Sequence, residues 1–286
     1  DVDGFRNYLR SNGKSIATIE SYSHDAMAFL TYVEQNNLVA AQPEALIGYC
    51  AYLTEIEHAR TNSVRRRAIG VRLFFRYLQA KQNLTFSSMD GVPLPQRQDI
   101  GVTPFEPEDI DRLLETCSLE TNNLRRFRNV CIVTLLAFEG LKATEVLKLE
   151  WKDVFVSQAS ATLHVAGQRA RTLSLQLESV AALEAYRTHF KQNSPGFTAA
   201  SRKIFVAFKG RQSAATLPQM SRHGLKFFLY ELGETARVDK VTAESLRQYA
   251  AFHLLESGQT MDDVLARLGL RRPGKVRLIA KSIEIE

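Results

Sequence analysis

The sequence predicts a mainly α-helical protein with a small β-sheet, divided into an all-helical N-terminal domain and a mostly helical second domain. Two observations predict this class. Apolar residues recur at helical spacing through most of the chain, and a stretch with several Pro, Gly and Ser residues interrupts that period at 84–105. Short strand-like segments are confined to 161–165 and 172–175.

The composition indicates a folded protein with a basic excess. Of 286 residues, 45% are hydrophobic and 24% are charged, and the net charge is +6. The excess favours a polyanionic partner. The three cysteines lack the spacing of a metal site, so neither a metal nor another cofactor is predicted, and they are typical of a reducing compartment. Because no apolar run reaches the ~18 residues of a membrane span, we expect a cytoplasmic protein without a membrane partner.

The helices of the first domain are indicated by their start signals and apolar periods. Ser15 is a candidate N-cap for a helix with apolar residues between Ile19 and Val33, and Pro43 suits the first turn of the next helix. A fourth helix is expected to begin near Thr61. The first domain therefore spans residues 1–83.

In the second domain, Pro107 opens a helix whose first turn is acidic, as the positive end of a helix dipole favours. A strongly apolar helix over 123–138 leads to a turn at Gly140. Further helices are expected at 177–191, 221–236, 243–256 and 260–268. In the tail, Ile283 and Ile285 alternate with glutamates, a pattern typical of an edge strand.

Four separated motifs carry a family resemblance. The segments from Leu135 to Leu149 (LLAFEGLKATEVLKL) and from Thr242 to Ala251 (TAESLRQYAA) closely resemble the two active-site boxes of tyrosine recombinases, the phage integrase and Xer family. The segments 15–22 and 62–67 are similar to parts of its N-terminal core-binding domain. The resemblance implies a SAM-like core-binding domain at 1–83, a linker at 84–105, a catalytic-fold domain at 106–270, and a tail at 271–286. The family's tail docks on a neighbouring subunit, and the alternative is a tail folded onto its own domain.

The resemblance also implies where phosphate-binding residues should stand. The family uses two arginines to hold the scissile phosphate, because the planar guanidinium makes paired charge-assisted hydrogen bonds. The first position is Lys142, which keeps the charge but not the fork, and the second is Arg247. The alternatives are a solvated lysine at a turn and an internal salt bridge between Arg247 and Glu145. Glu139, Glu145 and Glu244 are further expected to form internal ion pairs there.

The remaining catalytic positions are occupied by residues that cannot perform the family chemistry. The lysine that acts as general acid is replaced by Gln168, and the two histidines of the second box by Glu244 and Gln248. Leu270 stands at the His or Trp position, and Ile279 at the nucleophilic tyrosine. No tyrosine follows Tyr249, which is expected to pack in the core because it lies about 200° around its helix from Arg247.

These substitutions predict a catalytically inactive DNA-binding protein. Its expected partners are double-stranded DNA and either further copies of itself or an active tyrosine recombinase, beside which it would serve as an accessory, architectural or regulatory subunit. One alternative is an active recombinase that takes its nucleophile or other catalytic groups from a partner subunit. Another is a scaffold whose main partner is a protein.

The predicted DNA contacts fall into five groups. Those on the helix after Thr61 are Asn62, Arg65, Arg66 and Arg76, and those on the hairpin are Arg169 and Arg171. A basic loop contributes Lys209 and Arg211, and the next helix contributes Arg222, His223 and Lys226. Lys142 and Arg247 complete the set. For the helix after Thr61, the alternative is a solvated basic face.

Overall fold

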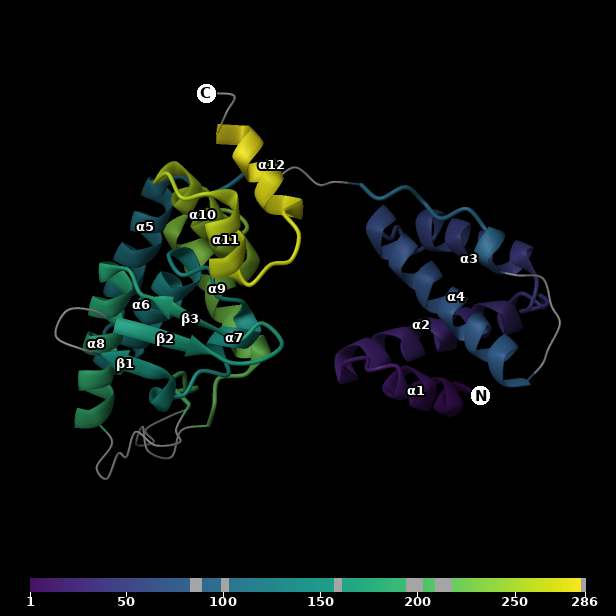
Figure 1. Cartoon of the computed structure of the whole chain (residues 1–286), viewed down its shortest axis with the longest axis horizontal. Helices are drawn as coiled ribbons and strands as arrows, with labels where there is room; N and C mark the ends of the chain where they lie inside the picture. Colours follow the sequence, from purple (N-terminus) through teal and green to yellow (C-terminus); the bar gives the residue numbers. More distant parts are fainter. Residues whose placement is uncertain (83–88, 99–102, 157–160, 194–202, 209–217, 284–286) are drawn as a thin grey trace. The chain divides into compact units, whose positions relative to one another are not determined.

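The structure is a computed structural model that describes all residues except 83–88, 99–102, 157–160, 194–202, 209–217 and 284–286 (Figure 1). It divides into two compact units, Asp1–Ile100 and Gly101–Glu286. The described residues confirm the predicted class, since helices predominate and the sheet has three strands.

The first unit is a bundle of helices around one apolar core. Ser15 caps α2 by accepting a hydrogen bond from the Thr18 amide, and Pro43 is the first residue of α3, as predicted. Phe29 and Tyr49 meet edge to face in the core. The helices are α1 (Val2–Ser11), α2 (Ile16–Gln35), α3 (Pro43–Glu55) and α4 (Thr61–Gln82).

Residues 89–98, which we call the strap, pack on α4 rather than serving only as a linker. A short 3-10 helix, η1 (Met89–Gly91), opens the strap, and Met89 and Val92 are buried in the core of the first unit. This unit extends to Ile100 instead of ending at residue 83. The prolines that indicated a linker also favour an extended segment, and sequence alone does not separate the two.

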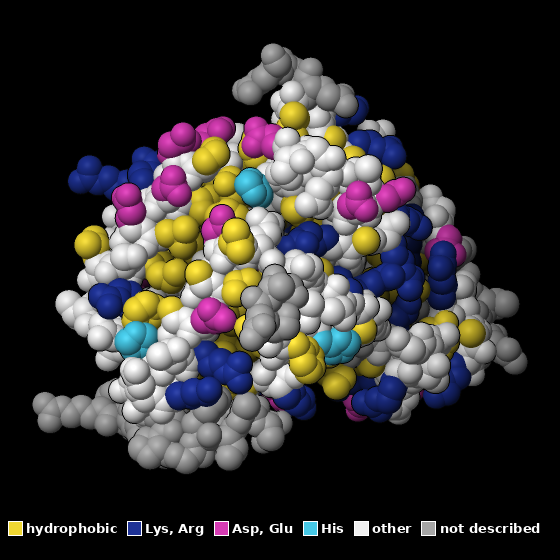
Figure 2. All heavy atoms as spheres, turned by 60° about the vertical axis from the view of Figure 1, so that its left-hand side comes forward, with side chains coloured by type: hydrophobic (Ala, Val, Ile, Leu, Met, Phe, Trp, Pro, Cys, Tyr) yellow, Lys and Arg dark blue, Asp and Glu magenta, His cyan; other side chains and the backbone are white. Residues whose placement is uncertain are grey.

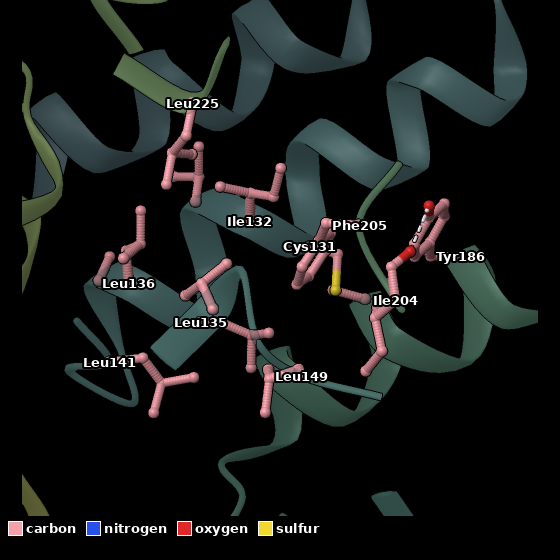
Figure 3. Close-up of a cluster of buried hydrophobic side chains, with 14 of the residues drawn as sticks. Cys131, Ile132, Leu135, Leu136, Leu141, Leu149, Tyr186, Ile204, Phe205 and Leu225 are labelled. Atoms are coloured by element: carbon pink, nitrogen blue, oxygen red, sulfur yellow. Dashed lines mark hydrogen bonds between the residues drawn. The ribbon is translucent and has the colours of Figure 1, made fainter. Parts of the chain in front are cut away.

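The second unit is organised around α6, whose residues from Cys131 to Ala137 are all buried. Figure 3 shows Cys131, Ile132 and Leu135 of this helix within the apolar cluster. The Tyr186 hydroxyl of α8 donates a hydrogen bond of 2.9 Å to the Ile204 carbonyl. The helices are α5 (Pro107–Ser118), α6 (Asn123–Ala137), α7 (Ala143–Val146), η2 (Trp151–Asp153), α8 (Leu177–Gln192), α9 (Arg222–Ala236), α10 (Ala243–Glu256), α11 (Met261–Leu268) and α12 (Gly274–Ile283).

The sheet is antiparallel, with strand order β1-β2-β3. Strand β2 (Ala161–Val165) has its predicted bounds, and β3 (Arg171–Ser174) begins one residue before the predicted segment. Strand β1 (Val154–Val156) was not predicted, because three residues are too short for a period to be recognised.

The tail forms a helix, so the expected edge strand is wrong for Ile283, the last residue of α12, while Ile285 lies outside the described residues. Helix α12 packs on α10 (Figure 1). Val276 and Ile279 are buried there with Leu254 and Val264. The helical spacing of these apolar residues fixes the tail as a helix, and the isoleucine alternation was too short to compete with it.

Gly140 sits at the turn between α6 and α7 and supports the first motif. Its φ is +64°, and an added Cβ would lie 2.1 Å from Leu268 Cδ2 and 3.3 Å from Ala250 Cβ. We therefore expect Gly140→Ala to lower the free energy of unfolding by about 2 kcal/mol through left-handed strain and overpacking. Urea unfolding measures this, with Gly258→Ala as control, which shares a positive φ but has open space. Equal destabilisation of the two variants would contradict the close-packing explanation.

Candidate nucleic-acid interface

Glu145 is the centre of a charged network in the second unit. It belongs to the first turn of α7, where its carboxylate accepts a hydrogen bond of 2.9 Å from the Lys142 amide. The Arg171 guanidinium binds both carboxylate oxygens, at 2.9 and 3.0 Å. Lys142 Nζ lies 3.7 Å from one oxygen and Arg247 3.9 Å from the other. Three cations thus surround one carboxylate.

The protonation of Glu145 reflects this setting. Burial by itself raises the pKa of the carboxyl, but hydrogen bonds from Arg171 and the Lys142 amide, with the charges of both residues, outweigh it. The pKa therefore lies below its usual value. Glu145 is therefore ionised near neutral pH.

Arg247 lies in the interior, not at the surface. Only 6% of the residue is exposed, and its guanidinium donates to the Gly140 carbonyl at 2.6 Å and to the Leu268 carbonyl. Burial lowers its pKa. The internal partner considered as an alternative, Glu145, is the one found beside it. Contact between Arg247 and a DNA phosphate stays a prediction, and these partners would have to yield to it.

Arg171 differs in the same way from its predicted place on an open hairpin. Its side chain is 10% exposed, because besides Glu145 it donates to the Arg267 carbonyl at 2.6 Å. Arg169, two residues earlier, is half-buried, and Gln168 is exposed in the turn. The hairpin sequence showed two basic residues without indicating that one of them points inward.

The three acids converge only in part. Glu139 is fully buried and accepts hydrogen bonds from Arg267 of α11 and from the Gln176 amide. Glu244 is instead exposed and pairs with Lys275 of α12 at 2.9 Å. Glu145 forms ion pairs with both predicted phosphate-binding residues, Lys142 and Arg247, whereas Glu244 only lines a surface near Lys142. Sequence reasoning missed Arg267 as the partner of Glu139 and Lys275 as the partner of Glu244, since each comes from a distant segment.

The other positions of the family's catalytic machinery lie in several environments. Gln248 of α10 is half-buried, and Leu270 packs beside the cluster that contains Ile279. Tyr249 is in the core as predicted, 6.2 Å from the Phe138 ring, and burial raises its pKa to about 12.

A cleft of about 860 Å³ lies where α9 and α10 begin, beside the start of α7. Its lining includes Lys142, Arg222, His223 and Lys226, with Glu244 as the acid among them. Arg222 and Lys226 are exposed, and neither has an ion pair within the described part of the chain. Free cations beside helix N-termini suit an anionic ligand such as a phosphate.

Tyr230 is a surface residue on α9 that sequence reasoning missed. It is 60% exposed and lies about 40° around the helix from Lys226, on the side that carries the cleft cations. On the face shown in Figure 2, Lys and Arg side chains are interspersed with acidic and apolar ones. A polyanion site must therefore be sought in a local group of cations, and the cleft supplies one.

On α4, three of the four predicted DNA contacts bind the strap instead. Asn62 exchanges two hydrogen bonds with the main chain of Gln98, at 2.8 and 3.1 Å. Arg65 donates to the Pro95 carbonyl, and Arg76 forms an ion pair of 2.9 Å with Asp90. A fourth donor, Arg72, which was not predicted, binds the Val92 carbonyl.

The lengths of α4 and of the strap explain why the strap binds several residues along this helix. Residues 62–76 of a helix rise about 21 Å. In the strap, the end of the 3-10 helix from residue 90 to 92 adds about 4 Å, and the proline-containing segment 92–98, taken as extended, spans about 19 Å. One face of α4 therefore meets the strap along its length, in antiparallel order. The side chains of Asn62, Arg65 and Arg76 thus bind the strap, and their contact with DNA stays a prediction.

The fourth, Arg66, pairs with buried Asp25 of α2 and also donates to Ser21, while its own side chain is 45% exposed. Arg66 thus stays partly open to a DNA phosphate, as does Arg76, whose side chain is 56% exposed. Lys209 and Arg211 lie outside the described residues.

If Asn62 fixes the strap, Asn62→Ala should speed amide hydrogen exchange at Gln98 by about fivefold, since one hydrogen bond contributes about 1 kcal/mol. Exchange measured on the full chain tests this. Asn7→Ala, which changes an exposed asparagine of α1, is the matched control. Unchanged exchange at Gln98 would mean that the other strap contacts suffice.

Comparison with known proteins decides the family. The sequence model of the Phage integrase family matches residues 104–278, more than half of the chain, and that of the phage integrase N-terminal SAM-like domain matches residues 2–82. The chain belongs to the phage integrase family. This phage integrase family protein is 24% identical over 273 residues to a putative tyrosine recombinase of Caldanaerobacter subterraneus, covering 94% of this chain and 88% of the relative. It is 24% identical to the tyrosine recombinase XerD of Listeria innocua, covering 94% and 89%.

Solved structures share the fold of this phage integrase family protein. The XerH site-specific recombinase bound to palindromic difH substrate, in a post-cleavage complex, matches with a TM-score of 0.73 at 16% identity over 95% of this chain and 81% of that one. A λ integrase dimer bound to a COC′ core site matches with a TM-score of 0.68 at 9% identity, over 97% and 93%.

Two further features concern the described residues as a whole. Among them no helix combines the length and apolar character needed to cross a bilayer. Within the same residues, no three His, Cys, Asp or Glu side chains are grouped so as to hold a metal ion.

Proposed function

We propose that this chain is a tyrosine-recombinase family member that holds duplex DNA at a specific site without cutting it. It would act as an accessory, architectural or regulatory subunit in recombination or integration. It would do so either as an oligomer of identical chains or beside an active recombinase. The network around Glu145 would then keep the region of Lys142 and Arg247 folded. The cleft at the start of α9 and α10 would contact the DNA backbone.

The observation that carries this proposal is the state of Ile279. The family resemblance assigns this position to the nucleophilic tyrosine. Here the residue is aliphatic and 1% exposed, on the side of α12 that packs on α10 and α11. A hydrocarbon side chain cannot form a phosphodiester, and its burial makes the position part of the core. Without the nucleophile, the covalent intermediate cannot form.

Two observations support DNA binding. Arg222 and Lys226 of the cleft have no ion pair among the described residues, and solved structures of similar proteins are bound to a substrate or a core site. The XerH and λ integrase structures are described as complexes with DNA, and the λ integrase one as a dimer. Arg222 and Lys226 on α9 would contact phosphates, and His223 and Tyr230 are placed to reach the same surface. Such contacts position the protein on a duplex, and base-edge contacts would add specificity.

The test has two stages on the same protein. Selection from a random duplex pool should yield a defined motif of about a dozen base pairs, and a nicked duplex carrying that motif is then used for covalent trapping. An active Xer recombinase with its own site is the positive control. We expect binding without a covalent adduct.

Three results would overturn the proposal. An adduct that Tyr230→Phe abolishes would show an active enzyme with displaced chemistry, and an adduct formed only beside a partner recombinase would show shared catalysis. Absence of DNA binding even at low salt would favour a protein-directed scaffold.

A further inference from the structure

The outward face of α12 is cationic. Val276 and Ile279 face the core, whereas Arg277 and Lys281 each lie about 160° around the helix from Ile279 and are exposed. Arg271 and Arg272 are exposed in the turn just before the helix. The tail thus presents basic side chains outward from a helix that is anchored by its apolar side.

Almost all of this charge is unpaired. Lys275 is neutralised by Glu244 at 2.9 Å. The four cations Arg271, Arg272, Arg277 and Lys281 have no ion pair among the residues that the structure describes. The outward face therefore carries a positive potential that the rest of the described unit does not cancel.

The arrangement is electrostatically unfavourable for the helix itself. Arg277 and Lys281 are four residues apart, where like charges repel. Arg271 and Arg272 lie at the N-terminal end of α12, where the helix dipole is positive and acids are favoured. Both penalties become attractions beside a polyanion, because its phosphates neutralise the cations and suit the helix terminus.

The position of α12 indicates which polyanion would bind this face. Glu244, which pairs with Lys275, also lines the cleft that contains Lys142 and Lys226. The start of α12 is thus joined to the rim of the candidate DNA interface. We propose that the outward face of α12, with Arg271, Arg272, Arg277 and Lys281, is an additional binding surface for the phosphate backbone of duplex DNA. This inference rests on the proposed function.

The experiment uses the full chain and a duplex without a selected motif, with affinity measured by fluorescence anisotropy from low to moderate NaCl concentration. The variant Arg277→Gln/Lys281→Gln removes two exposed charges. We expect the slope of log K against log salt to decrease by about 0.9 for each phosphate that the variant no longer neutralises. The conservative variant Arg277→Lys/Lys281→Arg should keep the wild-type slope. Thermal unfolding checks that the variants remain folded.

A matched control separates local contact from net charge. Lys148→Gln/Lys191→Gln removes two exposed lysines from other surfaces of the same unit and should leave the slope within error of wild type. Equal slopes for wild type and the α12 variant, or equal decreases in the α12 and control variants, would overturn the inference while leaving DNA binding intact. No binding by wild type would overturn the proposed function, and the inference with it.

Discussion

Glu145→Ala is expected to lower the free energy of unfolding of the second unit by about 3–5 kcal/mol, because it leaves buried cations without their anion. Arg171 and Arg247 have side chains that are 10% and 7% exposed, and Arg171 would lose a bidentate pair. Urea unfolding followed by circular dichroism measures the change. Glu244→Ala is the matched control: its carboxylate also pairs with a lysine but is exposed, so the change should stay within about 0.5 kcal/mol.

The same pair of proteins gives a pH test. The pKa of Glu145 is lowered in the folded state, so its contribution is fully present above the unfolded value of about 4.3 and is lost as pH falls through the lower folded value. The stability difference between wild type and Glu145→Ala should therefore be constant near neutral pH and shrink only in acid. A difference that vanishes between pH 6 and 8 would mean that another group supports the network.

The helices of this protein could be predicted because their signals are local. Ser15, Pro43 and Pro107 mark helix starts through backbone chemistry that needs no tertiary partner. The nearly continuous apolar run in the second half of α6, from Cys131 to Ala137, likewise follows from burial on all sides. The two-residue alternation at Ile283 failed because a longer helical period in the same segment packs more apolar surface.

The candidate site could be predicted in composition but not in pairing. The family motifs contain Lys142, Glu145 and Arg247, and they already indicate Glu145 as one possible partner of Arg247. The carbonyls of Gly140 and Leu268 that hold Arg247 carry no sequence signal, since every residue has one. The partners of Arg171 and Arg65 are also set by chain crossings, so a basic residue in the sequence did not reveal whether it faces DNA or protein.

Arg222→Glu/Lys226→Glu is expected to weaken binding to duplex DNA by about 10²–10³-fold at low salt. Each reversal replaces an attraction with a repulsion, and charges 4 Å apart interact by about 1 kcal/mol in water and about 4 at the effective dielectric near a protein surface. Two reversals at about 2 kcal/mol each give the stated range. Both side chains are exposed, so folding should be unaffected. Anisotropy titrations at fixed low salt measure the change.

Lys148→Glu/Lys191→Glu makes the same change in net charge on other surfaces of the second unit and should weaken binding far less. The contrast between the two variants matters more than either value, because a net charge of +6 gives any acidic substitution some general effect. Equal weakening would mean that DNA is attracted by the overall field and the cleft is not the interface. Arg66, held by Asp25 and still partly exposed, would then be the first residue to test in its place.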